Sequence, residues 1–126
     1  MSVSRRQARR QALFLLDQWD LSGQEIGSQY AGEIDPWARG VAESVAERAE
    51  ELDARITSAS EGWTADRLGT VERSALRVAV HELQSGEVPA EVAINEAVAF
   101  TKRYASEDGA RLVNGILGKI QREEAA

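Results

Sequence analysis

Four arginines near the start of the chain have the clearest capacity for chemistry. They are Arg5, Arg6, Arg9 and Arg10, and the first sixteen residues contain no acid, so this stretch carries a charge of +4. A guanidinium group stays charged at physiological pH and forms paired hydrogen bonds with phosphates. At about 100° per residue, a helix places these side chains on one flank and part of its back, and leaves a separate apolar seam.

The same cluster is unfavourable for folding. Cations in the first turns of a helix oppose its macrodipole, and like charges four residues apart repel each other. A polyanionic ligand would explain the cluster, so the sequence predicts a nucleic-acid contact at these four arginines. The alternative is a solvated terminus whose charge has no function.

A second unusual stretch lies near the end of the chain. Gly115 and Gly118 interrupt a segment with helical periodicity, although glycine costs about 1 kcal/mol relative to alanine inside a helix. Both glycines lie opposite the apolar positions, Arg111 and Asn114 border the same face, and Lys102 lies on the preceding predicted helix. Bare backbone beside guanidinium and amide donors suits an RNA backbone or a protein partner. A locally weak helix is the alternative.

Composition excludes several classes of site. The chain has no cysteine, which excludes disulfides, thiolate catalysis and cysteine metal sites. His81 is the single histidine, so a site built from several histidines cannot form and a histidine-based triad has little support. No glycine-rich phosphate loop is present. We therefore predict a protein that is not an enzyme and carries neither a metal nor a cofactor.

Length and charge are typical of one folded, acidic domain. The 126 residues are 43% hydrophobic and 29% charged, with a net charge of −6, and the acids concentrate in residues 17–61, which carry −8. An acidic protein with one basic end can hold a polyanion at that end. No apolar run approaches the ~18 residues that cross a membrane, and the start is unlike a secretory signal. We expect a cytoplasmic protein without membrane contact.

Helical periodicity runs through the whole chain. Ser4, Asp35 and Ser106 are predicted helix caps, and Pro36 stands at the first position of the second helix. Apolar residues at steps of three and four predict helices after these caps and over residues 71–83 and 89–104, with a short turn at 65–68. We expect an all-α fold of about six or seven helices in one domain, residues 1–126. A boundary at 57–69 divides it into two small packed subdomains, approximately residues 1–60 and 61–126.

Two details of the expected packing concern the tryptophans. One apolar stripe continues from Trp37 to Ile56, which predicts a single helix over that stretch. Trp19, Trp37 and Trp63 are expected in the core or at its edge, not as a platform on which nucleic-acid bases stack.

Several stretches, in chain order, are similar to the NusB family of transcription antitermination factors. Residues 71–83 (VERSALRVAVHEL) resemble a central signature of that family, and residues 88–97 (VPAEVAINEA) resemble its most specific stretch. Residues 113–117 (VNGIL), followed by Lys119, resemble its closing motif. The arginine cluster before Trp19 is similar to the family's start, so the resemblance covers nearly the whole chain.

The resemblance implies two packed helical bundles that pair with the ribosomal protein NusE and bind the boxA element of nascent, single-stranded RNA. This complex would help RNA polymerase, reached indirectly, to resist termination, notably in ribosomal RNA operons. By position, Arg5, Arg6, Arg9 and Arg10 match the family's arginine-rich RNA-binding segment, and Lys102, Asp108 and Arg111 fall in its C-terminal RNA-contacting region. Glu72 matches an acidic position at the NusE surface.

Two positions depart from the family pattern. Asp17 stands where an aromatic residue can appear on the first helix, and Gly118 replaces a common acidic residue, which leaves the RNA contacts there open. The alternative function is a non-catalytic helical adapter between proteins, without sequence-specific RNA binding. The sequence also leaves open whether the chain is a monomer or a homodimer.

Overall fold

The computed structural model describes residues 3–125, and this range folds into helices without any strand. The elements are α1 (Arg5–Ser22), α2 (Pro36–Glu47), α3 (Ala49–Ala59), a short 3-10 helix η1 (Ala65–Arg67), α4 (Thr70–Ser85), α5 (Ala90–Tyr104) and α6 (Glu107–Ala125). The predicted all-α class is confirmed. None of these helices is long and apolar enough to cross a membrane.

The helix starts follow the predicted capping residues. The Ser4 hydroxyl accepts a hydrogen bond from the backbone N–H of Gln7, whose side chain accepts one from the N–H of Ser4 in return. Asp35 accepts from the N–H of Ala38, with a proline at the first position of α2. Each cap satisfies backbone groups that a helix end otherwise leaves without partners.

The stretch from Trp37 to Ile56 is two helices instead of one, so the prediction of a single helix is wrong. The break falls at Arg48, which lies between α2 and α3 with φ −97° and ψ 10°. Its guanidinium hydrogen-bonds to Nδ1 of His81 on α4, at 2.9 Å, and also to Gln84. The apolar spacing continues through the break, so the spacing alone does not reveal the junction.

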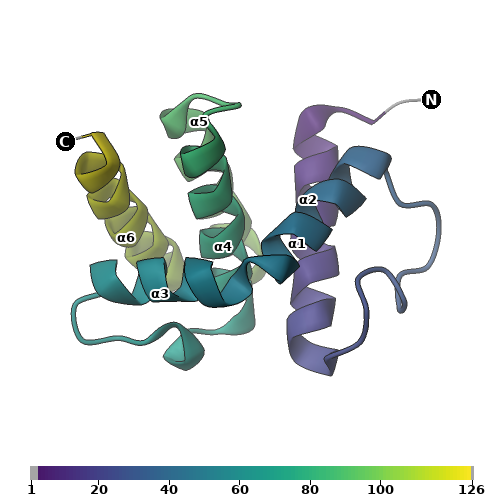
Figure 1. Cartoon of the computed structure of the whole chain (residues 1–126), viewed down its shortest axis with the longest axis horizontal. Coiled ribbons are helices and arrows are strands. Elements are labelled where there is room, and N and C mark those ends of the chain that lie inside the picture. Colours follow the sequence, from purple (N-terminus) through teal and green to yellow (C-terminus); the bar gives the residue numbers. More distant parts are fainter. Residues whose placement is uncertain (1–2, 126) are drawn as a thin grey trace.

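Helix α4 lies at the centre of the fold and contacts each of the other five α-helices. Figure 1 shows α1 and α2 at one end of the molecule and α6 at the other, with α4 and α5 between them and α3 crossing past α4 and α6. The main hydrophobic core contains residues of all six α-helices, including the fully buried Leu16, Leu52, Leu76 and Leu117. The core is thus continuous across the point near residue 60 where we expect two subdomains to meet, and that division stays a prediction.

The tryptophans do not behave alike. Trp19 and Trp37 are partly buried, as expected. Trp63 is 50% exposed, so the expectation of a core position is wrong for this residue. It lies in a loop directly after Glu61 and Gly62, whose φ angles are both positive (29° and 92°), and helical periodicity says nothing about a loop side chain.

Candidate nucleic-acid interface

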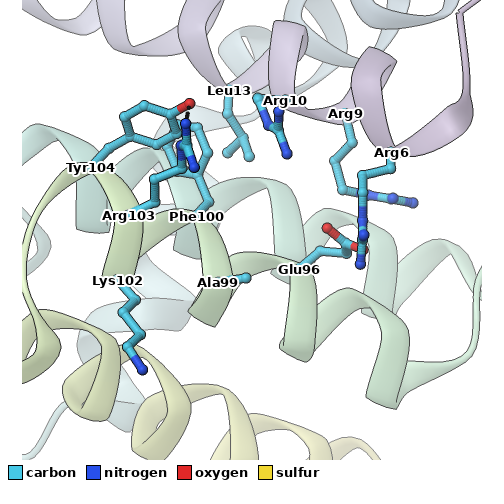
Figure 2. Close-up of a pocket in the computed structure, with 10 residues that line it drawn as sticks. All are labelled: Arg6, Arg9, Arg10, Leu13, Glu96, Ala99, Phe100, Lys102, Arg103 and Tyr104. Atoms are coloured by element: carbon cyan, nitrogen blue, oxygen red, sulfur yellow. Dashed lines mark hydrogen bonds and ion pairs between the residues drawn. The ribbon is translucent and has the colours of Figure 1, made fainter.

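A basic groove of about 360 Å³ lies between α1 and α5. Its walls are Arg6, Arg9, Arg10 and Leu13 from α1, and Glu96, Ala99, Phe100, Lys102, Arg103 and Tyr104 from α5 (Figure 2). Five of these ten side chains are cationic and one is acidic, on a chain whose net charge is −6. The groove concentrates positive charge where the sequence predicts contact with a polyanion.

Two of the predicted arginines are available to a ligand in this groove. Arg10 is exposed and, among residues 3–125, has no ion pair. Arg6 Nε lies 2.9 Å from Oε1 of Glu96, but the Arg6 side chain is 69% exposed. The pair uses Nε of Arg6, so the other N–H groups of this exposed guanidinium are open to a phosphate.

Arg5 lies beside the groove, where its guanidinium stacks 4.1 Å above the centre of the Trp37 ring. Arg5 is nevertheless exposed. A guanidinium held over an aromatic face keeps its N–H donors at the edge, and these remain free to meet a phosphate.

Arg9 differs from the other three arginines of the predicted cluster because it is buried. Its side chain is only 5% exposed and forms a bidentate pair with Glu82 of α4, with distances of 2.8 to 3.1 Å. Burial of an arginine requires such a partner, and a carboxylate in the inward face of α4 supplies it. Arg9 lines the groove, but its charge is paired inside the protein, and a contact of Arg9 with RNA stays a prediction. The signal in the sequence was Glu82, an acid among the apolar positions of its helix.

The predicted C-terminal residues meet at a second hollow of about 370 Å³ between α5 and α6. Lys102, Arg111 and Asn114 all line it, together with Glu107. Lys102 also lines the first groove, and Figure 2 shows its side chain pointing away from the α1 arginines toward α6. Lys102 thus connects the groove between α1 and α5 with the hollow between α5 and α6, which the sequence analysis predicts as two separate RNA contacts.

The cations of this second hollow are paired only at the surface. Arg111 pairs with Asp108, and these side chains are 72% and 89% exposed. Lys102 Nζ lies 3.8 Å from Oε1 of Glu107. Asp108 does not line the hollow itself and acts there only through Arg111.

Glu72 lies apart from the basic groove, at the start of α4, and is partly buried. Its carboxylate packs against the first turn of α6, since a methyl group placed on Gly109 would come within 3.0 Å of Glu72 Oε1. A negative charge near a helix N-terminus is favourable, so Glu72 has a structural contact as well as its predicted role toward a partner.

Arg103 and Tyr104 are groove residues that the predicted site omits. Tyr104 is 37% exposed, and its ring packs edge-on against Phe14 with the ring centres 4.9 Å apart. Arg103 Nε donates a hydrogen bond to the Tyr104 hydroxyl at 3.1 Å. An aromatic ring beside guanidinium groups suits an unpaired base next to its phosphate.

Comparison with known proteins identifies the family of this chain. Residues 6–122 match the model of the NusB family. A transcription antitermination protein NusB from Rubrobacter xylanophilus is 41% identical over 122 residues, which cover 91% of this chain and 88% of that protein. The transcription antitermination protein NusB of Salinispora tropica is 39% identical, and the match covers 93% of this chain and 94% of that protein.

Solved structures of similar proteins share the fold. NusB of T. maritima superposes with a TM-score of 0.86 at 31% identity, covering 98% of this chain and 94% of that one. A second similar chain comes from a crystal structure of the antitermination factors NusB and NusE in complex with double-stranded RNA. It superposes with a TM-score of 0.81 at 29% identity, covering 94% of this chain and 96% of that one. On the family match and these relatives, the chain belongs to the NusB family.

Proposed function

We propose that this protein is a transcription antitermination factor that binds boxA-type RNA together with NusE and promotes processive transcription, notably of ribosomal RNA operons. It acts by binding, in the cytoplasm, and reaches RNA polymerase only through the assembled complex. The observation that carries the proposal is the groove between α1 and α5, which Arg6 and Arg10 line from α1 and Arg103 and Tyr104 line from α5.

The groove suits single-stranded RNA better than a duplex. Phosphates are bound by the exposed guanidinium groups, and Tyr104 offers an aromatic surface to a base that is free to unstack. In a duplex the bases are stacked on one another and their flat faces are not accessible to a side chain. We therefore expect single-stranded RNA to bind more tightly than the same sequence as a duplex.

The NusE contact is proposed at the start of α4. Glu72 lies there, away from the basic groove, and a carboxylate complements a basic ribosomal protein. Glu72→Lys should weaken binding of NusE more than binding of RNA by the isolated protein. Equal losses would mean a disturbed fold or a shared surface, because Glu72 also packs against α6.

The experiment that tests RNA binding is a fluorescence-anisotropy titration of labelled boxA-type RNA, a scrambled RNA and a duplex, with and without NusE. The double variant Arg6→Ala/Arg10→Ala should bind more weakly and show a shallower dependence on salt, because two phosphate contacts are lost. Far-UV circular dichroism should show unchanged helix content.

The matched control is Arg67→Ala, which removes an exposed charge on η1, outside the groove. It should leave RNA affinity close to that of the unchanged protein. Unchanged affinity in the α1 double variant would exclude the groove as the RNA site. Equal binding to boxA-type and scrambled RNA, even with NusE, would favour the protein adapter.

A further inference from the structure

Trp63 borders a hollow that the proposed RNA site does not use. The hollow measures about 440 Å³ and lies between the loop after α3 and one face of α6. Trp63 is 50% exposed and, within residues 3–125, has no aromatic or cationic side chain stacked on it. By contrast, Trp37 lies under the guanidinium of Arg5. A large ring left open to solvent beside a hollow is an unoccupied surface for another flat group.

The wall of the hollow opposite Trp63 is basic. Arg111, Lys119 and Arg122 line it against the single acid Glu61. Lys119 Nζ lies 3.3 Å from Oε1 of Glu61, whose side chain is 83% exposed, so this pair contributes little and can exchange. Arg122 is exposed. The hollow thus carries a net positive charge on an acidic protein, which suits a phosphate-bearing ligand.

Gly115 on this wall leaves the backbone of α6 open. A methyl group placed there would meet no atom within 4 Å, so packing does not require glycine at this position. Alanine would favour the helix more than glycine does. The missing side chain instead lets a ligand approach the α6 backbone within the hollow, opposite the Trp63 ring.

The hollow is linked to the basic groove by side chains that line two neighbouring hollows each. Arg111 lines both this hollow and the one that contains Lys102, and Lys102 lines the groove between α1 and α5. Three concave, basic surfaces therefore follow one another from the α1 arginines to Trp63. This arrangement favours one extended polyanion over a compact acidic protein, which would touch a single surface.

From these contacts we infer that Trp63 is a stacking platform for an unpaired RNA base beyond the α1–α5 groove, with Lys119 and Arg122 binding the neighbouring phosphates. This inference rests on the proposed function, since it extends the same RNA strand. The base lies on the indole, and the bare backbone at Gly115 admits it from the other side. A longer RNA then gains a contact that a short one cannot reach.

The test compares RNA length and variant together. Dissociation constants are measured by anisotropy for a short boxA-type RNA and for the same RNA lengthened by several nucleotides at its 5′ end or its 3′ end. We expect one extension to tighten binding to the unchanged protein by about tenfold, the size of one stacked base. Trp63→Leu should abolish this gain while binding the short RNA normally, and Trp63→Phe, which keeps a ring, should retain most of it.

Gly115→Ala is the second variant and separates binding from folding. It should unfold at a higher urea concentration than the unchanged protein and yet lose most of the gain from the longer RNA. Failure of every protein to bind the short RNA would overturn the proposed function itself. Normal binding of the short RNA with an undiminished length gain in Trp63→Leu would overturn only this inference. If that variant instead loses NusE binding or self-association, the surface belongs to a protein and the inference is likewise overturned.

Discussion

The guanidinium of Arg9 and the carboxylate of Glu82 form a bidentate ion pair that joins α1 to α4 inside the protein. The Arg9 side chain is 5% exposed and that of Glu82 is 6% exposed. Arg9 thus differs from the other arginines of its cluster, which reach solvent. One of four neighbouring cations stabilises the fold, and the other three face outward.

The Arg9 pair predicts a stability defect instead of a binding defect. Arg9→Met leaves the carboxylate of Glu82 buried without its partner, which should lower the free energy of unfolding by about 3–5 kcal/mol. The double variant Arg9→Met/Glu82→Leu should recover much of that loss, because both charges are then gone. Urea unfolding followed by circular dichroism measures both. Normal stability with weakened RNA binding in Arg9→Met would instead support the predicted contact of Arg9 with RNA.

Removing the charge of Glu96 should increase the affinity for RNA. Its Oε1 lies 2.9 Å from Nε of Arg6, in the groove where we expect a phosphate to bind. Glu96→Gln keeps the shape and removes the competing charge, so RNA should bind a few-fold more tightly, by roughly 1 kcal/mol or less. Glu91→Gln, an exposed acid on the same helix that does not line this groove, is the matched control. An equal gain in both variants would show that net charge alone sets the affinity.

Substitution by alanine should change the stability of the protein differently at two glycines of α6. Gly115→Ala meets open space and should stabilise the protein by about 0.5–1 kcal/mol, since alanine is the better helix former. A methyl group on Gly109 would come within 3.0 Å of Glu72 Oε1 and 3.1 Å of Ser106 Oγ. Gly109→Ala should therefore gain less than Gly115→Ala, or lose stability. Thermal unfolding compares the two, and equal stabilisation would mean that Glu72 moves away without cost.

Because of His81, we expect the free energy of unfolding to fall in mild acid. Burial, and then the nearby charge of Arg48, lower the pKa of His81 below its usual 6.5, against the smaller opposing effects of Glu82 and Glu87. The unfolded chain then takes up a proton more readily than the folded one, so this contribution is present above pH 6.5 and is lost as pH falls through the lowered pKa. In addition, Arg48 donates to Nδ1, which a protonated ring cannot accept.

The measurement for His81 is urea unfolding at about pH 7.5 and about pH 5.5, which bracket the ordinary pKa of histidine. The unchanged protein should lose stability between these values, and His81→Gln should lose less, because glutamine does not titrate. Identical losses in both proteins would assign the pH dependence to other groups.

The helices are predicted well from the sequence, because helix caps and the apolar periodicity depend on residues that are close together in the chain. Ser4 and Asp35 begin the helices that their chemistry predicts. The break at Arg48 could not be predicted, because the apolar spacing runs on through it and the contacts of Arg48 with His81 and Gln84 come from a distant part of the chain.

The candidate site was predicted less completely. Arg6, Arg10 and Lys102 line one groove, and Lys102 also lines a second hollow with Arg111 and Asn114. The angle of Arg9 on an isolated helix could not show that Glu82, 73 positions away, draws it inward. Likewise, the exposure of Trp63 depends on a loop, where spacing carries no information.

The groove between α1 and α5 also has a consequence for synthesis of the protein. Arg6 and Glu96, which meet across it, are 90 positions apart, and one wall is complete only when Tyr104 has been made. The arginines leave the ribosome first, before the acids that later pair with Arg6 and Arg9 have been translated. An incomplete chain therefore displays the cations without the surface that arranges them, and only a nearly finished polypeptide has the groove.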